Sequence, residues 1–125
     1  PDSSVYDGVY ESTNKGIHSS QSYMYIDING YERFKFYVRS NAESSYDYVV
    51  VSDLDCTLNS STTSGSNVKM TTSGKQNSNT SINGYTLVEF TGIDKGSHTI
   101  TVMYRKDNSQ NTNDDKGYIL IPKVQ

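Results

Sequence analysis

The sequence of 125 residues predicts an all-β fold, a two-sheet antiparallel β-sandwich of jelly-roll type with about eight strands. Three observations lead to this prediction. Apolar residues recur with a period of two along several segments, which is typical of strands with one buried face. Asn-Gly, Lys-Gly and single Gly residues separate those segments and can supply the positive φ of tight turns. No long segment shows the apolar stripe of a helix.

The strands follow from these patterns in chain order. Three segments alternate strictly, and their predicted buried faces are Met24, Ile26 and Ile28; Phe34, Phe36 and Val38; and His98, Ile100, Val102 and Tyr104. Residues 86–91 would bury Val88 and Phe90. Two runs without alternation, 46–51 and 118–121, predict strands that are central or covered on both faces. The predicted strands span residues 8–12, 22–28, 31–39, 46–52, 67–72, 85–91, 97–105 and 117–122.

The composition is unusually polar. Ser, Thr and Asn make up 42 of the 125 residues, which on its own could indicate disorder, but a net charge of only −3 and 11 Tyr residues favour a folded domain. The excess concentrates in predicted rim loops at residues 57–83 and 107–117. We expect a single domain over residues 1–125, cut from a longer chain, because the N-terminus shows no signal segment and the end falls just past the last strand.

Charge and hydropathy restrict the partners. With 11 Lys and Arg against 14 Asp and Glu, the chain has no basic excess for nucleic acid. Its longest apolar runs are far shorter than the roughly 20 residues of a membrane helix, so no membrane insertion is expected. The single Cys56 cannot form an internal disulfide, and with His18 and His98 it cannot complete a closed zinc site.

Three segments resemble a known family. Residues 34–51 carry an aromatic strand and then Y-D-Y before a second strand, residues 96–109 contain G-S-H-T-I and Y-R-K-D-N-S, and residues 114–122 read D-D-K-G-Y-I-L-I-P. Over residues 30–58 and 84–123 the chain is similar to MAM-like jelly-roll domains of surface proteins of gut anaerobes (Bacteroidales and Clostridia) and of structural proteins of their phages. It departs from them at Tyr118, where a Trp is usual, at Leu120, where an acidic residue is usual, and in lacking paired cysteines. The resemblance implies an extracellular, cell-surface or virion location.

Motifs of catalysis are missing from the sequence. It contains no nucleophile elbow, zinc-protease motif or phosphate-binding loop. His98 lies on the apolar face of its strand, so we interpret it as a packed or capped core histidine, whereas His18 is expected in solvent. The pairs Asp53/Asp55 and Asp114/Asp115 fall in polar turns rather than the apolar pocket that would raise a catalytic carboxyl's pKa. We therefore predict a protein that is not an enzyme.

One loop is a candidate Ca²⁺ site. Asp107, Asn113, Asp114 and Asp115 offer side-chain oxygens of the kind Ca²⁺ prefers. The spacing does not match the EF-hand pattern, and the alternative is that this loop is merely solvated.

Tyrosines are the candidate ligand-binding residues. Tyr23, Tyr25 and Tyr37 point away from the predicted apolar faces and could form a stacking platform for sugars. The alternative is that they fill the edges of the sandwich core or a contact between subunits.

Together these observations predict a noncatalytic adhesion or carbohydrate-binding module of an exported gut-bacterial surface protein or of a phage receptor-binding protein. Its partner would be a glycan or a surface protein. The alternative is a structural virion or surface-assembly domain that associates with its own copies as a homo-oligomer.

Overall fold

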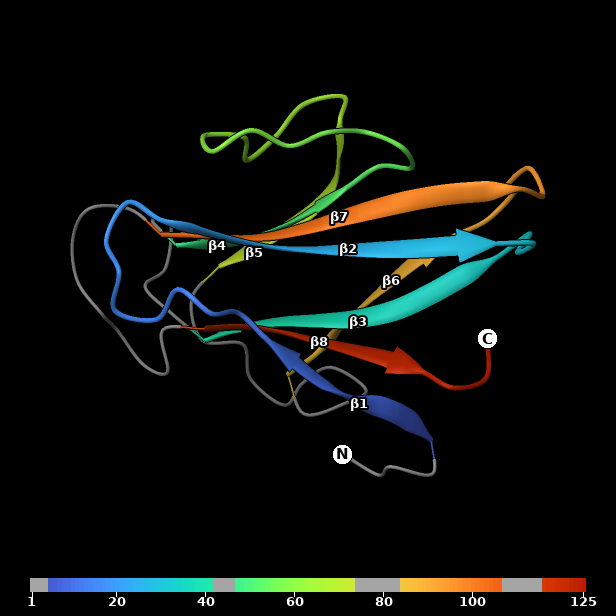
Figure 1. The fold of residues 1–125 in the computed structure, drawn as a ribbon, viewed down its shortest axis with the longest axis horizontal. Coiled ribbons are helices and arrows are strands. Elements are labelled where there is room, and N and C mark those ends of the chain that lie inside the picture. Colours follow the sequence, from blue (N-terminus) through green and yellow to red (C-terminus); the bar gives the residue numbers. More distant parts are fainter. Residues whose placement is uncertain (1–4, 42–46, 74–83, 107–115) are drawn as a thin grey trace.

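The computed structural model of the chain describes residues 5–41, 47–73, 84–106 and 116–125 (Figure 1). Within these residues eight strands form two four-stranded antiparallel sheets packed face to face. The strands are β1 (Tyr6–Glu11), β2 (Gln21–Asn29), β3 (Phe34–Asn41), β4 (Tyr48–Ser52), β5 (Val68–Ser73), β6 (Thr86–Phe90), β7 (Ser97–Arg105) and β8 (Lys116–Pro122). In the part of the chain that the structure describes, no helix could cross a membrane.

The strand order is that of a jelly roll, which confirms the predicted fold class. One sheet, the β1 sheet, has the order β1-β8-β3-β6, and the other, the β2 sheet, has the order β2-β7-β4-β5. The pairs β4–β5, β3–β6, β2–β7 and β1–β8 are nested like one long hairpin. The pairs β4–β7 and β3–β8 then close each sheet. This wrapping leaves β1 and β2 as edge strands on the same side of the sandwich (Figure 1).

The core lies between the two sheets and uses the predicted faces. Phe34, Phe36 and Val38 of β3 are buried, and opposite them lie Ile26 and Ile28 of β2. The core is completed by Val49, Val51, Val88, Phe90, Ile93, Ile100, Val102, Tyr104 and Ile119. Because these side chains come from strands far apart in sequence, their burial holds the two sheets together.

The two runs without alternation are central strands, as predicted. β4 lies between β7 and β5, and β8 lies between β1 and β3. Val50 and Leu120 face away from the core between the sheets, yet Val50 is fully buried and Leu120 nearly so. Each sheet therefore carries a covered patch on its outer face, which a simple period of two does not predict.

Only one strand boundary differs by more than two residues from the prediction. β3 begins at Phe34 rather than near residue 31. Gly30 has a φ of 83°, its N–H donates to Gly96 O, and Ile93 N–H donates to Glu32 O. The chain from Gly30 to Glu32 is thus part of a turn bonded to the β6–β7 connection, not of the strand ladder.

Candidate functional site

The outer face of the β2 sheet is partly covered by a long connection. This connection, residues 53–67, joins β4 to β5 and lies over β7 (Figure 1). The Asp55 N–H donates to Thr99 O over 2.8 Å, and Arg105 Nε donates to Ser60 O over 3.0 Å. Thr99 and Arg105 lie toward opposite ends of β7, so the connection follows that strand. The outward residues of β2 lie beside it, toward the sheet edge.

Polar side chains of residues 53–67 bond to the connection itself. Asn59 Oδ1 accepts from the Ser61 N–H over 3.0 Å, and Thr62 Oγ1 accepts from the Asn59 N–H over 3.1 Å. Asn67 Nδ2 donates to Thr57 O over 3.3 Å. Such side-chain bonds stabilise turns that have no strand partner. Part of the Ser, Thr and Asn excess therefore builds an ordered surface loop.

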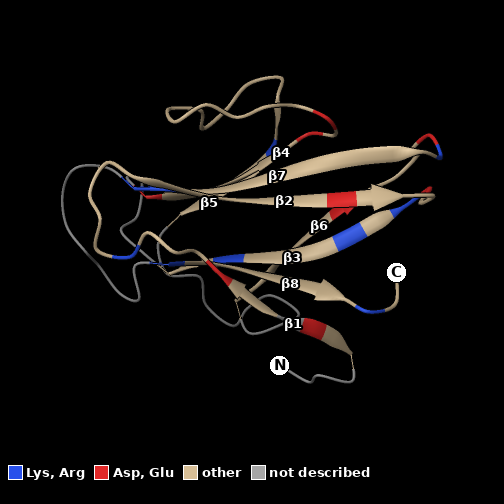
Figure 2. Cartoon of the chain, viewed as in Figure 1, with Lys and Arg blue, Asp and Glu red and all other residues tan. Residues whose placement is uncertain are grey.

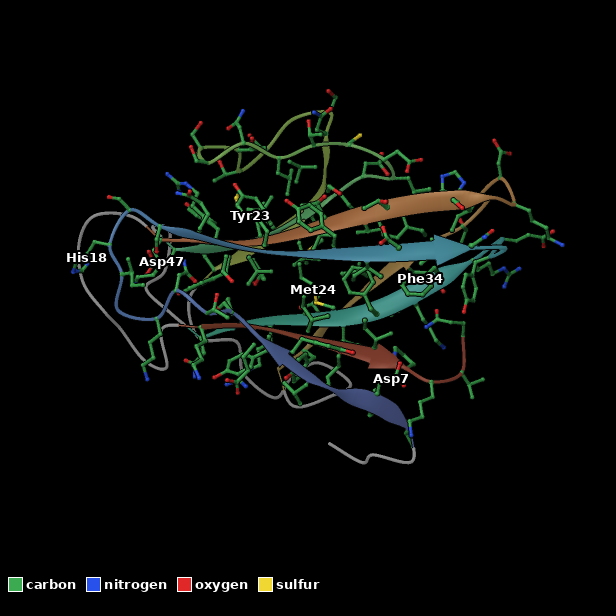
Figure 3. All side chains as sticks on the ribbon, in the orientation of Figure 1. Asp7, His18, Tyr23, Met24, Phe34 and Asp47 are labelled. Atoms are coloured by element: carbon green, nitrogen blue, oxygen red, sulfur yellow. The ribbon has the colours of Figure 1, made fainter. Side chains whose placement is uncertain are left out.

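Tyr23 and Tyr25 form what we call the tyrosine ledge. Both lie on edge strand β2 and point to its outer face, and Figure 3 shows Tyr23 on that side and Met24 between the sheets. Tyr23 is 39% exposed and Tyr25 62% exposed. Their ring centroids are 6.3 Å apart, and their planes lie within 5° of parallel. The two parallel rings are thus stacked along the strand, and both are partly open to solvent.

Tyr37, the third predicted platform residue, lies elsewhere. It belongs to β3 in the other sheet, is half-buried, and meets Tyr6 edge to face at 6.3 Å. It packs against a cluster on the outer face of the β1 sheet formed by Tyr85, Tyr118 and Leu120. Sequence alternation places Tyr37 on an outer face but does not say of which sheet. The structure therefore brings together Tyr23 and Tyr25 without Tyr37.

A cleft opens between edge strands β1 and β2. It has a volume of about 250 Å³, and we call it the β1–β2 cleft. Its floor is apolar and includes Met24, Val102 and Ile119, while Tyr10 and Tyr23 are among its other lining residues. Sequence reasoning missed it, because no local pattern indicates where two strands of different sheets separate. The cleft adjoins the tyrosine ledge, since Tyr23 belongs to both.

His98 is held at both ring nitrogens. Its Nδ1 lies 2.6 Å from Asp55 Oδ2, and its Nε2 lies 2.7 Å from Asp94 O. A carboxylate and a carbonyl are both acceptors, so the two bonds together require a ring protonated on both nitrogens. The hydrogen bond to the Asp55 carboxylate, and next the one to the Asp94 carbonyl, raise the pKa of His98. The hydrogen bond from His98, and next the one from the Thr99 N–H, lower the pKa of Asp55. His98 is thus a capped histidine that joins the 53–67 connection to β7.

This pair makes stability depend on pH. The raised His98 pKa gives stabilisation that is complete below the ordinary value of 6.5 and is lost as pH rises through the folded value. The lowered Asp55 pKa gives stabilisation present above 3.8 that is lost as pH falls through the folded value. We therefore expect His98→Gln to lower the Tm more at about pH 5.5 than at about pH 8.5. Thermal unfolding at both pH values checks this, with His18→Gln at an exposed histidine as control. An equal loss at both pH values would contradict it.

The two carboxylates of the pair Asp53/Asp55 accept hydrogen bonds from different backbone N–H groups. Asp55 Oδ1 accepts from the Thr99 N–H over 2.9 Å, and Asp53 Oδ1 accepts from the Leu54 N–H over 2.9 Å. Asp114/Asp115 and the candidate Ca²⁺ residues Asp107, Asn113, Asp114 and Asp115 lie outside the described residues. In the ranges that are described, no three His, Cys, Asp or Glu side chains gather as a metal site.

Comparison of the chain with protein-family models, with characterised proteins and with solved structures found no match. The strand order makes the domain a jelly-roll β-sandwich, and the resemblance to MAM-like domains stays a prediction.

Proposed function

We propose that this domain is a noncatalytic adhesion or carbohydrate-binding module, and that the tyrosine ledge binds a neutral glycan. The observation that carries the proposal is the pair of exposed, nearly parallel rings of Tyr23 and Tyr25 on an edge strand. Large exposed apolar groups held in a fixed orientation are a feature of binding surfaces. The apolar faces of sugar rings match such a surface, because their C–H groups can pack on an aromatic ring while their hydroxyls stay in water.

Polar groups lie next to the ledge. Asp27 takes the next outward position on β2, and its Oδ1 accepts from Thr99 Oγ1 over 2.8 Å. A carboxylate can accept about four hydrogen bonds, so Asp27 can also accept from a sugar hydroxyl. The neighbouring 53–67 connection adds Ser, Thr and Asn side chains. Stacking would supply affinity, and these groups would orient the ligand.

The charge on this face favours a neutral ligand. Asp27 is the only charged residue of β2, and Figure 2 shows it as the single coloured band on that strand. Arg105 of β7 bonds Ser60 O and lies over the Tyr48 ring at 5.9 Å. A site for sulfated or uronic-acid glycans would need a cluster of cationic groups. An exported surface protein or a virion protein is the setting we propose for such a module, on the strength of the family resemblance.

Binding to defined oligosaccharides tests the proposal. We expect the domain to bind on an array of neutral plant, mucin and bacterial oligosaccharides, and Tyr23→Ala with Tyr25→Ala to weaken the strongest interaction at least about tenfold. Tyr31→Ala is the matched control, because Tyr31 has the same 39% exposure as Tyr23 but lies outside β2. Circular dichroism should show the variants folded. Binding that survives the double substitution, or no binding to any neutral oligosaccharide, would refute the ledge as a glycan site.

A further inference from the structure

The free edge of β2 differs from the other sheet edges in the described residues. The nine residues of β2 pair with β7 in a register without a shift, and Asp27 is their only charge. β1 and β5 have register shifts and carry charged residues, and β6 is only five residues long and contains Glu89. Bulges, charges and shortness are the features that keep sheet edges from pairing with other chains. Of the four edge strands in the described part of the chain, β2 is the least protected against pairing with another chain.

The β1–β2 cleft adds apolar surface beside that edge. Its floor includes Met24, Val102 and Ile119, and its lining residue Tyr10 is 42% exposed. Both the cleft and the β2 edge are on the side of the sandwich where β1 and β2 are the edge strands (Figure 1). A chain that paired with β2 would therefore also cover apolar groups at the cleft. Hydrogen bonding and hydrophobic burial would act in the same place.

We propose that β2 pairs antiparallel with β2 of a second copy of this chain, about a twofold axis at Tyr25. If all nine residues of Gln21–Asn29 pair with the same strand of the second copy, the twofold axis must pass through the middle residue, which is Tyr25. It places Tyr25 opposite Tyr25 and Tyr23 opposite Asp27 of the second copy. The two Asp27 residues are then about four residues, or roughly 13 Å, apart along the ladder. At that separation, salt at physiological strength screens most of their repulsion.

This dimer goes beyond glycan binding and does not depend on it. Strand pairing uses the backbone edge of β2, so the rings of the tyrosine ledge remain on the outer face. The two β2 sheets would join into one eight-stranded sheet, and the two ledges would meet at the axis. A glycan long enough to span both would gain from the higher effective concentration of the second site.

Molar mass and cross-linking test the dimer. Analytical ultracentrifugation of the whole chain at micromolar concentration should give a molar mass twice that of one chain, which is 14.0 kDa. Tyr25→Lys should weaken association at least about tenfold, because it sets like charges directly opposite each other, whereas Tyr31→Lys should not. In a Cys56→Ser background, Tyr25→Cys should form a disulfide-linked dimer under mild oxidation, and Tyr31→Cys should not.

Two results would overturn this proposal. One is a monomer mass at micromolar concentration, which would leave the β2 edge for a different protein or for no partner. The other is a dimer that Tyr25→Lys leaves intact, which would place the contact elsewhere on the domain. Neither result bears on glycan binding, which the array measures separately.

Discussion

Replacing Lys106 with Met is expected to lower the free energy of unfolding by about 3–5 kcal/mol. Lys106 follows β7 and Asp47 precedes β4, and the side chains of both are completely buried with Nζ 3.7 Å from Oδ2. Removing the ammonium leaves the Asp47 carboxylate buried without this ion pair, and a buried charge that loses its counter-ion is strongly destabilising. Urea unfolding followed by circular dichroism measures the loss.

Lys116→Met provides the matched control. Its Nζ is only 2.7 Å from Glu11 Oε2, but the two side chains are 27% and 47% exposed. Water screens this pair, so we expect a cost of at most about 1 kcal/mol despite the shorter distance. Replacing both buried partners, as in Lys106→Met with Asp47→Leu, should recover much of the lost stability. If Lys106→Met cost no more than Lys116→Met, burial would not control the strength of the pair.

Gly117→Ala is expected to destabilise the domain by about 1–3 kcal/mol. Gly117 lies in β8, and a Cβ there would come within 2.7 Å of Val49 Cγ2 and 3.2 Å of Tyr104 Cδ1. Both neighbours are almost fully buried, and the β-branched Val49 has little rotamer freedom to move away. Close approach of β8 to the opposite sheet therefore requires glycine at this position. Chemical denaturation of the variant gives the size of the effect.

A double-mutant cycle separates this clash from other effects. Val49→Ala alone removes two methyl groups and should also destabilise, because it leaves a cavity. In the double variant the new methyl group at residue 117 fills part of that space, so the double substitution should cost less than the two single ones together, by about 1 kcal/mol. Additive costs would show that the clash with Val49 is not the cause.

The fold was largely predictable because burial leaves a local mark in sequence. Alternation identified the core faces of β2 and β3, and its absence identified the central strands β4 and β8. The predicted start of β3 was wrong because Gly30 and Glu32 form hydrogen bonds with the β6–β7 connection. Such a contact between segments distant in sequence leaves no local pattern.

The candidate site was predictable only in part. Tyr23 and Tyr25 were placed together because both belong to one strand. Tyr37 could not be assigned to its sheet, because alternation shows the face of a strand but not its neighbours. The β1–β2 cleft and the Asp55–His98 bond join residues distant in sequence, and neither carries a motif. His98 was predicted to be a packed or capped core histidine; its ring is capped by Asp55 and Asp94, but it is only partly buried and is not part of the core cluster.

Locating the bound glycan on the domain tests whether the tyrosine ledge is the binding site. Ring-labelled tyrosines can be followed by NMR while the neutral oligosaccharide that binds most strongly on the array is added. We expect the Tyr23 and Tyr25 signals to shift with one common dissociation constant, while those of Tyr37 and Tyr85 on the opposite sheet stay unchanged. Shifts at Tyr37 and Tyr85 with none at Tyr23 and Tyr25 would contradict it.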